Sequence, residues 1–463
     1  MLTAAVAASV AVAFADSSIV VLALPDLYGA FDTTIVGVSL VITSYNLVVA
    51  VVAAVVAFTR VDARRAAQIG LVLFAGASAG CAAAWSLAAL IAFRCVQGLG
   101  AALLLASSLA LLGGLRGSRA RGAALWTTVA VLGAALGPVL GGVLTQLFDW
   151  RAIFVVQAPV AAVALLATRG THALPDEAPR RRRRGALAAD AALGLVFAAL
   201  VGALFLAVLL VITVWGLEPI TGALVVSALP AATLAARPLG RGLSMPLAVG
   251  GGSLLLAAGL AALALLPRVS NALVALALAF CGTGIGLAVP VLTRASLDLE
   301  IASGTGPAGP FPSPCRGQGP VPEAVSLVRS GAITVAARHA GLVLALVLVA
   351  PLLTGSLDDA GRRALLGGTK EILDANVPIR KKVPIALALR DALEQAPRGE
   401  VPDLGKPFDD AGARSDSHVR EARDDLVTTL ESALTRGFRP AFGLAALFAL
   451  LSIVPAARLR RAA

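Results

Sequence analysis

The sequence predicts an all-α integral membrane protein with twelve membrane-spanning helices in two six-helix halves. Of its 463 residues, 58% are hydrophobic and 14% are charged, whereas soluble domains carry roughly 25% charged residues. Twelve apolar runs follow one another, and most approach the roughly 20 residues that a helix needs to cross a bilayer. Arginines gather in alternate connections between these runs, which is typical of cytoplasmic loops. This bias accounts for most of the net charge of +11, so we expect no nucleic-acid partner.

The apolar runs define the expected helices in chain order. They lie near residues 2–24, 34–58, 66–85, 87–112, 122–147, 150–169, 188–214, 218–238, 245–267, 271–293, 331–354 and 437–457. The seventh and eighth runs are the least distinct pair, because Trp215, Glu218 and Pro219 form only a short break between them. The arginine alternation predicts a multi-pass protein of the plasma membrane with both termini in the cytoplasm.

The same pattern predicts five segments. They are an N-terminal six-helix half (1–169), a basic cytoplasmic linker (170–187), helices 7–11 of the C-terminal half (188–354), an extracytoplasmic insertion (355–436), and helix 12 with a basic cytoplasmic tail (437–463). The insertion contains every lysine of the chain. Apolar residues at helical spacing in 385–396 and 419–434 predict a small helical cap. The alternative for this insertion is a solvated linker without packed structure.

A ridge of glycines marks the fifth apolar run. Gly133, Gly137 and Gly141 recur every four residues and therefore share one face of a helix. Such a face lets a neighbouring helix approach closely. Pro138 removes one backbone hydrogen bond and creates a point where the helix can bend. Gly142 follows Gly141 directly.

Several motifs together resemble one transporter family. The matching residues are the segments 16–25 and 44–47, the group Arg94, Gln97, Gly98 and Gly100 in the fourth run, and Gly133, Gly137, Pro138, Gly141 and Gly142 in the fifth. In these segments the chain resembles the drug:proton antiporters, or multidrug efflux proteins, of the major facilitator superfamily. The resemblance is closest over residues 10–160. It implies a bundle of twelve helices around a central cavity, with a fifth helix that limits leak.

The loop after the second run departs from the family pattern. The family usually has a glycine followed by Asp-Arg-x-Gly-Arg-Arg, and this loop helps to latch the cytoplasmic side. Here the loop supplies Arg60, Asp62, Arg64 and Arg65, without the glycines and with the acid displaced. The resemblance implies a cytoplasmic gate at these four residues, but the family's usual gating arrangement does not transfer directly.

A few ionisable groups are expected inside the membrane, where charge is expensive and usually functional. They are Asp16, Arg94, Arg338 and His339. Asp16 and Arg94 lie at similar depths at about 1.5 Å of helix rise per residue, and in the resembling fold both spans face the cavity. They are expected to form a proton-coupling pair, with a static buried salt bridge as the alternative. His339 could also titrate near neutrality, or it could be a hydrogen-bonded structural residue.

The expected cavity is mostly apolar. Tyr45, Asn46, Gln97, Trp126 and Arg338 are expected to supply its polar and aromatic groups, among Ala, Leu and Val side chains. Gln146 and Gln157 add further amides. Such a lining favours hydrophobic or amphiphilic molecules over sugars, which need many hydrogen-bonding groups.

No P-loop appears, so ATP is not expected as a direct energy source. No catalytic constellation, cofactor motif or metal motif is recognisable either, and we expect no enzyme. The favoured function is proton-coupled export of hydrophobic or amphiphilic small molecules. The alternatives are a lipid or lipid-like-molecule transporter that uses the 355–436 cap, and a non-transporting membrane receptor or scaffold. Expected partners are the lipid bilayer, the small-molecule substrate and protons, and a monomer is favoured.

Overall fold

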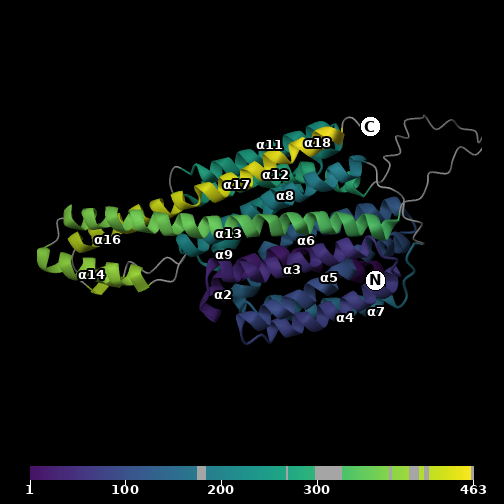
Figure 1. Cartoon of the computed structure of the whole chain (residues 1–463), viewed down its shortest axis with the longest axis horizontal. Helices are drawn as coiled ribbons and strands as arrows, with labels where there is room; N and C mark the ends of the chain where they lie inside the picture. Colours follow the sequence, from purple (N-terminus) through teal and green to yellow (C-terminus); the bar gives the residue numbers. More distant parts are fainter. Residues whose placement is uncertain are drawn as a thin grey trace, which may run out of the picture.

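A computed structural model describes residues 1–174, 184–266, 269–297, 326–374, 378–395, 406–410 and 417–459. Within these ranges all regular structure is helical, and Figure 1 shows an elongated helical bundle. Parts of the expected 170–187 linker and 355–436 insertion lie outside the described residues. An all-helical bundle follows from the apolar sequence, because a helix satisfies its own backbone hydrogen bonds in lipid.

The N-terminal half consists of long helices joined by short turns. In order they are α1 (Leu2–Ile19), η1 (Val20–Ala23), α2 (Leu24–Phe31), α3 (Ile35–Val56), α4 (Ala63–Ala82), α5 (Leu87–Arg116), α6 (Arg119–Leu147) and α7 (Ala152–Thr168). Thr34, Asp62, Ser86 and Ser118 each accept a hydrogen bond from a backbone N–H three residues later. These side chains satisfy otherwise unpaired donors and fix where α3, α4, α5 and α6 begin.

The C-terminal half continues the bundle. Its elements are α8 (Arg184–Val208), η2 (Leu209–Val214), α9 (Pro219–Val226), α10 (Ala228–Ala236), η3 (Leu239–Gly242), α11 (Met245–Ala264), α12 (Asn271–Ser296), α13 (Leu327–Asp374), α17 (Arg439–Leu451) and α18 (Ile453–Leu459). The short break between the seventh and eighth apolar runs forms a real turn. Gly216 adopts a φ of +64° there, which a residue without a Cβ reaches at little cost.

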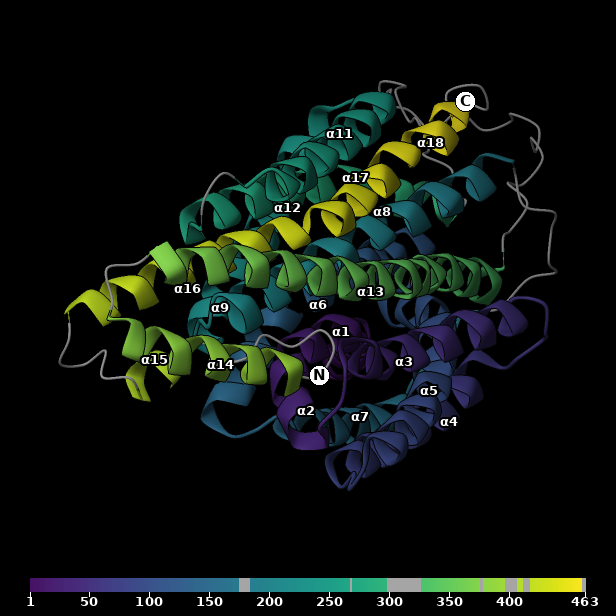
Figure 2. The same cartoon turned by 60° about the vertical axis from the view of Figure 1, so that its left-hand side comes forward.

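The helices agree with the predicted membrane spans. Eleven helical stretches in the described residues are long and apolar enough to cross a membrane. The one predicted span that is not among them is the sixth, which forms the 17-residue helix α7. The fold class expected from the sequence is confirmed. Figure 2 shows α11, α12 and α17 on one side of the bundle and α4, α5 and α7 on the other, with α13 between them.

Three further helices belong to the 355–436 region: α14 (Ile379–Gln395), α15 (Lys406–Asp410) and α16 (Ser417–Gly437). α14 and α16 lie where the sequence predicts helices, and α16 leads directly into α17. Figure 1 shows α14, α16 and the end of α13 extending together beyond the bundle. α13 is 48 residues long, so one continuous helix connects the bundle to these outer helices.

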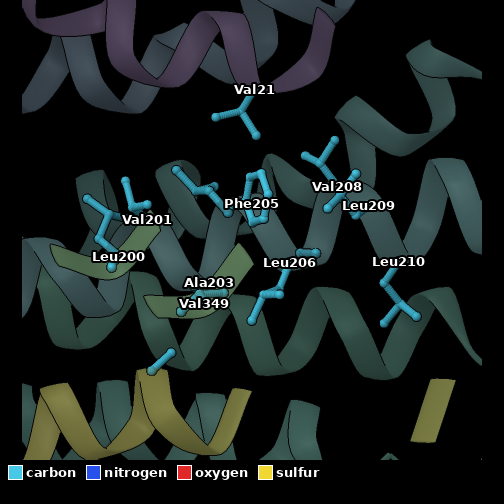
Figure 3. Packing of buried hydrophobic residues seen from close by; sticks show 14 of the residues in the cluster. Val21, Leu200, Val201, Ala203, Phe205, Leu206, Val208, Leu209, Leu210 and Val349 are labelled. Carbon is cyan, nitrogen blue, oxygen red and sulfur yellow. The ribbon is translucent and has the colours of Figure 1, made fainter. Parts of the chain in front are cut away.

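The core of the C-terminal half is centred on α8. Leu200, Val201 and Phe205 are almost fully buried, and Figure 3 shows Val21 of η1 lying opposite Phe205. Apolar contact therefore continues from the N-terminal half into the C-terminal half. This packing places the two halves on either side of a shared interior.

The glycine ridge of α6 packs directly against α1. A Cβ added at Gly133 would lie 2.2 Å from the carbonyl oxygen of Ala11, and one at Gly141 would lie 2.4 Å from that of Ile19. At Gly137 the added atom would lie 2.1 Å from the Ser18 hydroxyl oxygen. Only glycine permits backbones to approach this closely, so the ridge fixes the position of α1 and of the side chains that α1 carries.

Candidate functional site

A buried ion pair lies at the centre of the N-terminal half. Asp16 of α1 and Arg94 of α5 form it, and neither side chain is exposed to solvent. Arg94 also donates from Nε to the Val41 carbonyl oxygen at 3.0 Å and from Nη1 to Gln97 Oε1 at 2.7 Å. The structure therefore brings together the two charges that the sequence predicts as neighbours.

Two glutamines close this pair into a network. Gln157 of α7 donates from Nε2 to Asp16 Oδ1 at 2.8 Å. Gln97 Nε2 donates in turn to Gln157 Oε1 at 2.7 Å and to the Ser78 hydroxyl at 2.8 Å. Both carboxylate oxygens of Asp16 thus have a donor, Arg94 on one side and Gln157 on the other. The network joins α1, α4, α5 and α7, and its charge-assisted bonds are stronger than neutral ones.

Tyr45 and Asn46 border the network from α3. The Arg94 guanidinium carbon lies 4.3 Å from the centroid of the Tyr45 ring, an arrangement that favours a cation. The Tyr45 hydroxyl donates to the Ala13 carbonyl oxygen at 2.9 Å, and Ser17 donates to Asn46 Oδ1 at 2.8 Å. Both contacts tie α3 to α1.

An apolar cavity lies between the two halves. α6 forms one wall, and α8, α10, α12 and α13 form the others. The space between its lining side chains is about 540 Å³ when space open to the surroundings is included, and the lining includes Trp126, Phe197, Leu200 and Arg338. Trp126 and Arg338, two of the residues expected in the substrate cavity, both line this one. Tyr45, Asn46 and Gln97 do not line this cavity and lie around the Asp16–Arg94 pair instead.

Arg338 is held between two aromatic rings. Its guanidinium carbon lies 4.3 Å from the centroid of Phe14 on α1 and 4.3 Å from that of Phe197 on α8. Its neighbour His339 is fully buried, and His339 Nδ1 lies 2.8 Å from the Val335 carbonyl oxygen. The His339 ring is 6.5 Å from that of Phe14. Phe14 thus contacts the cavity cation from the helix that carries Asp16.

A further carboxylate lies inside the C-terminal half. Asp190 of α8 accepts a hydrogen bond from Ser296, whose hydroxyl lies 2.5 Å from that of Thr334. Thr334 also lines the cavity. The intramembrane charges expected from the sequence do not include Asp190. Its position within the apolar run 188–214 is the signal that identifies it.

The loop expected to form a cytoplasmic gate makes its polar contacts within the N-terminal half. Asp62 Oδ1 accepts from the Arg65 backbone N–H at 2.7 Å and caps α4. Arg64 donates to the carbonyl oxygen of Arg169 at the end of α7. Arg60 is exposed. Phe58, two residues before Arg60, contacts the other half. Its ring centroid lies 5.6 Å from the guanidinium carbon of Arg329 on α13.

A bundle of membrane-length helices, with a buried charge network in one half and a cavity between the halves, defines the architecture of a multi-pass membrane transporter. The chain belongs to the Major Facilitator Superfamily, which it matches over residues 6–299. This match covers more than half of the chain and confirms the family that the motifs predict.

Relatives within the family include resistance proteins. The chain is 36% identical over 201 residues to the multidrug resistance protein Stp of Mycobacterium tuberculosis, covering 42% of this chain and 36% of that protein. It is 35% identical over 192 residues to the methylenomycin A resistance protein of Bacillus subtilis, covering 40% of this chain and 41% of that protein. The chain therefore matches well under half of the length of these curated relatives.

The fold also has solved counterparts. The crystal structure of a bacterial homologue of the human lysosomal transporter Spinster, in an inward-facing and occupied conformation, superposes with a TM-score of 0.65 at 14% sequence identity. The superposition covers 100% of this chain and 96% of that chain. At this identity the likeness concerns the fold alone.

Proposed function

We propose that this protein is a proton-coupled secondary transporter that exports hydrophobic or amphiphilic small molecules across the plasma membrane. The observation that carries the proposal is the buried pair of Asp16 and Arg94, because α1, which carries Asp16, also contacts Arg338 in the cavity wall through Phe14. Asp16 is the member of the pair that can take up a proton, because arginine does not release its own at physiological pH.

Proton uptake at Asp16 would change the packing of α1. Neutral Asp16 no longer attracts Arg94, so the contact between α1 and α5 weakens. Phe14, one half-turn before Asp16, packs on the Arg338 guanidinium and lies 5.4 Å from the Trp126 ring, both in the cavity wall. A shift of α1 therefore alters the cavity. In this proposal α1 has one position when Asp16 is charged and another when it is neutral, and this difference couples proton binding to substrate binding.

The family and its resistance proteins support export as the direction of transport. The names of the relatives describe those proteins, and the shared segments span 42% and 40% of this chain. We further propose cytoplasmic termini and an extracytoplasmic position for 355–436, on the basis of the arginine-rich alternate connections. The roles of Arg60, Asp62, Arg64 and Arg65 as a cytoplasmic gate and of His339 in proton coupling are proposals of the same kind.

The test is flux in proteoliposomes with an imposed pH gradient. A panel of fluorescent hydrophobic and amphiphilic compounds is loaded, and proton movement is recorded with a pH-sensitive dye. Asp16→Asn should abolish gradient-driven flux while substrate binding persists. Asp359→Asn is the matched control, because the Asp359 side chain on α13 is 61% exposed. Equal gradient-driven flux in Asp16→Asn and the control would refute proton coupling through Asp16.

The same preparation separates the alternatives. Movement of labelled lipid between leaflets, without movement of the drug-like compounds, would favour a lipid or lipid-like cargo. Binding without flux under every gradient would favour a receptor or scaffold. Proton release on addition of substrate would favour the antiport mechanism.

A further inference from the structure

Among the residues that the structure describes, no carboxylate pairs with Arg338, the cation in the wall of the cavity between the halves. Arg94 is neutralised by Asp16 inside the N-terminal half. In the described part of the chain, the Arg338 guanidinium makes no hydrogen bond or ion pair with a protein group, although it is only 6% exposed. Asp190 reaches Thr334 through Ser296. A buried charge is normally paired, so the absence of a protein partner for Arg338 is informative.

The two aromatic rings around Arg338 stabilise a cation without using its donors. The faces of Phe14 and Phe197 attract the positive charge, but a benzene ring cannot accept the directional hydrogen bonds that a guanidinium offers through five N–H groups. Nε is buried without a partner. The rings therefore orient the guanidinium and leave its hydrogen-bonding capacity for a group that enters the cavity.

The remaining lining determines what else that molecule must carry. Leu200, Ile285 and Val289 provide apolar walls from α8 and α12. Thr334 precedes Arg338 by four residues on α13, so their side chains lie on the same helix face. The cavity thus combines one charged and hydroxyl-bearing helix face with surroundings that accept hydrocarbon.

We infer that this cavity binds an amphiphilic anion, with a carboxylate, sulfonate or phosphate head on Arg338 and an apolar tail along α8 and α12. An anionic head supplies the missing counter-charge and can accept two parallel N–H bonds from the guanidinium. A cationic head would add a like charge in a site that is sheltered from water. The inference deepens the proposed function and rests on it only for the statement that the bound molecule is transported.

Binding of three ligands with the same tail tests the inference directly. Octanoate, octanol and octyltrimethylammonium are compared by equilibrium dialysis against the full chain in nanodiscs, with partition into empty nanodiscs subtracted. We expect octanoate to bind at least about tenfold more tightly than either other ligand, which is the size of one hydrogen-bonded charge interaction. Octyltrimethylammonium binding as tightly as octanoate would overturn the inference.

Variants assign the preference to one residue. Arg338→Gln should remove the preference for octanoate and leave octanol binding within about twofold, whereas Arg338→Lys should retain a preference because it keeps the charge. Arg439→Gln is the matched control, because Arg439 is exposed at the start of α17. An unchanged octanoate preference in Arg338→Gln would overturn the inference. If that variant fails to fold, the ranking of the three ligands on the unmodified protein decides the question.

The outcome is separable from that of the transport proposal. Octanoate preference without any gradient-driven flux would leave the anion site standing and reject the transporter. Gradient-driven export of cations that is insensitive to Arg338→Gln would reject the anion site and leave the transporter standing.

Discussion

Replacement of Gly133 by alanine tests whether the close contact between α6 and α1 stabilises the bundle. The added Cβ would lie 2.2 Å from the Ala11 carbonyl oxygen, whereas weak carbon–oxygen contacts in proteins occur at about 3.3 Å. The two helices must therefore separate by about 1 Å or bend. The obstacle is a backbone atom, so no side-chain rotation relieves it.

The magnitude follows from two opposing contributions. Overfilling a packed site costs about 1–3 kcal/mol, while alanine stabilises the interior of a helix by about 0.5–1 kcal/mol relative to glycine. We expect a net destabilisation of about 0.5–2 kcal/mol. Gly76→Ala in α4 is the matched control, because a Cβ there meets nothing within 4 Å. Gly76→Ala therefore gains the higher helix propensity of alanine without the cost of overfilling.

Unfolding in mixed detergent micelles, titrated with a denaturing detergent, gives the free energy of unfolding of both variants. The difference between them removes the shared propensity gain and isolates the contact, which should amount to about 1–3 kcal/mol. Equal unfolding free energies for Gly133→Ala and Gly76→Ala would refute the argument that backbone proximity at the ridge determines stability. It would indicate that α1 moves aside at no cost.

Three further outcomes are expected. Arg94→Ala should abolish active transport in proteoliposomes and lower the unfolding free energy by about 3–5 kcal/mol, because Asp16 is left buried without its cation. Pro138→Ala should remove the point at which α6 can bend and raise uncoupled proton leak or reduce export, as measured by dye-reported pH decay and efflux. Arg362→Cys, in a background free of other cysteines, should react with an impermeant maleimide on intact cells, whereas Arg116→Cys should react only after permeabilisation.

Each of these expectations has a result that contradicts it. Normal gradient-driven flux in Arg94→Ala would remove this residue from the coupling mechanism, provided that the variant inserts into the membrane. Wild-type coupling in Pro138→Ala would show that a proline at this position is not needed to limit leak. Labelling of Arg362→Cys only after permeabilisation would place the end of α13 in the cytoplasm and reverse the proposed topology.

The bundle was accessible from the sequence because its determinants are local. An apolar run of membrane length has few alternatives to a helix, and Gly133 and Gly141 lie on one helix face by their spacing alone. This face can approach α1 closely because glycine has no side chain. The turn at Gly216 likewise follows from a short polar break in an apolar sequence.

The site was accessible only in part, because its contacts join distant segments. Pairing of Asp16 with Arg94 follows from the cost of isolated charge in a membrane. The donation from Gln157 to Asp16 spans 141 positions, and no spacing rule predicts which amide completes such a network. The separation of Tyr45 from the cavity is also a matter of helix rotation. A helix that is apolar all round gives little indication of which face looks inward.

The length of α13 has a consequence for how the state of the cavity is communicated. The helix has 48 residues and runs through Pro351 without interruption. From Arg338 to its end at Asp374 it extends about 54 Å at 1.5 Å per residue, and its outer part packs against α16. A tilt of about 10° at the cavity would displace that end by about 9 Å over this length. A small tilt of α13 at the cavity therefore becomes a large displacement at its outer end. A spectroscopic probe attached to the outer turns of α13 would report whether the cavity is occupied.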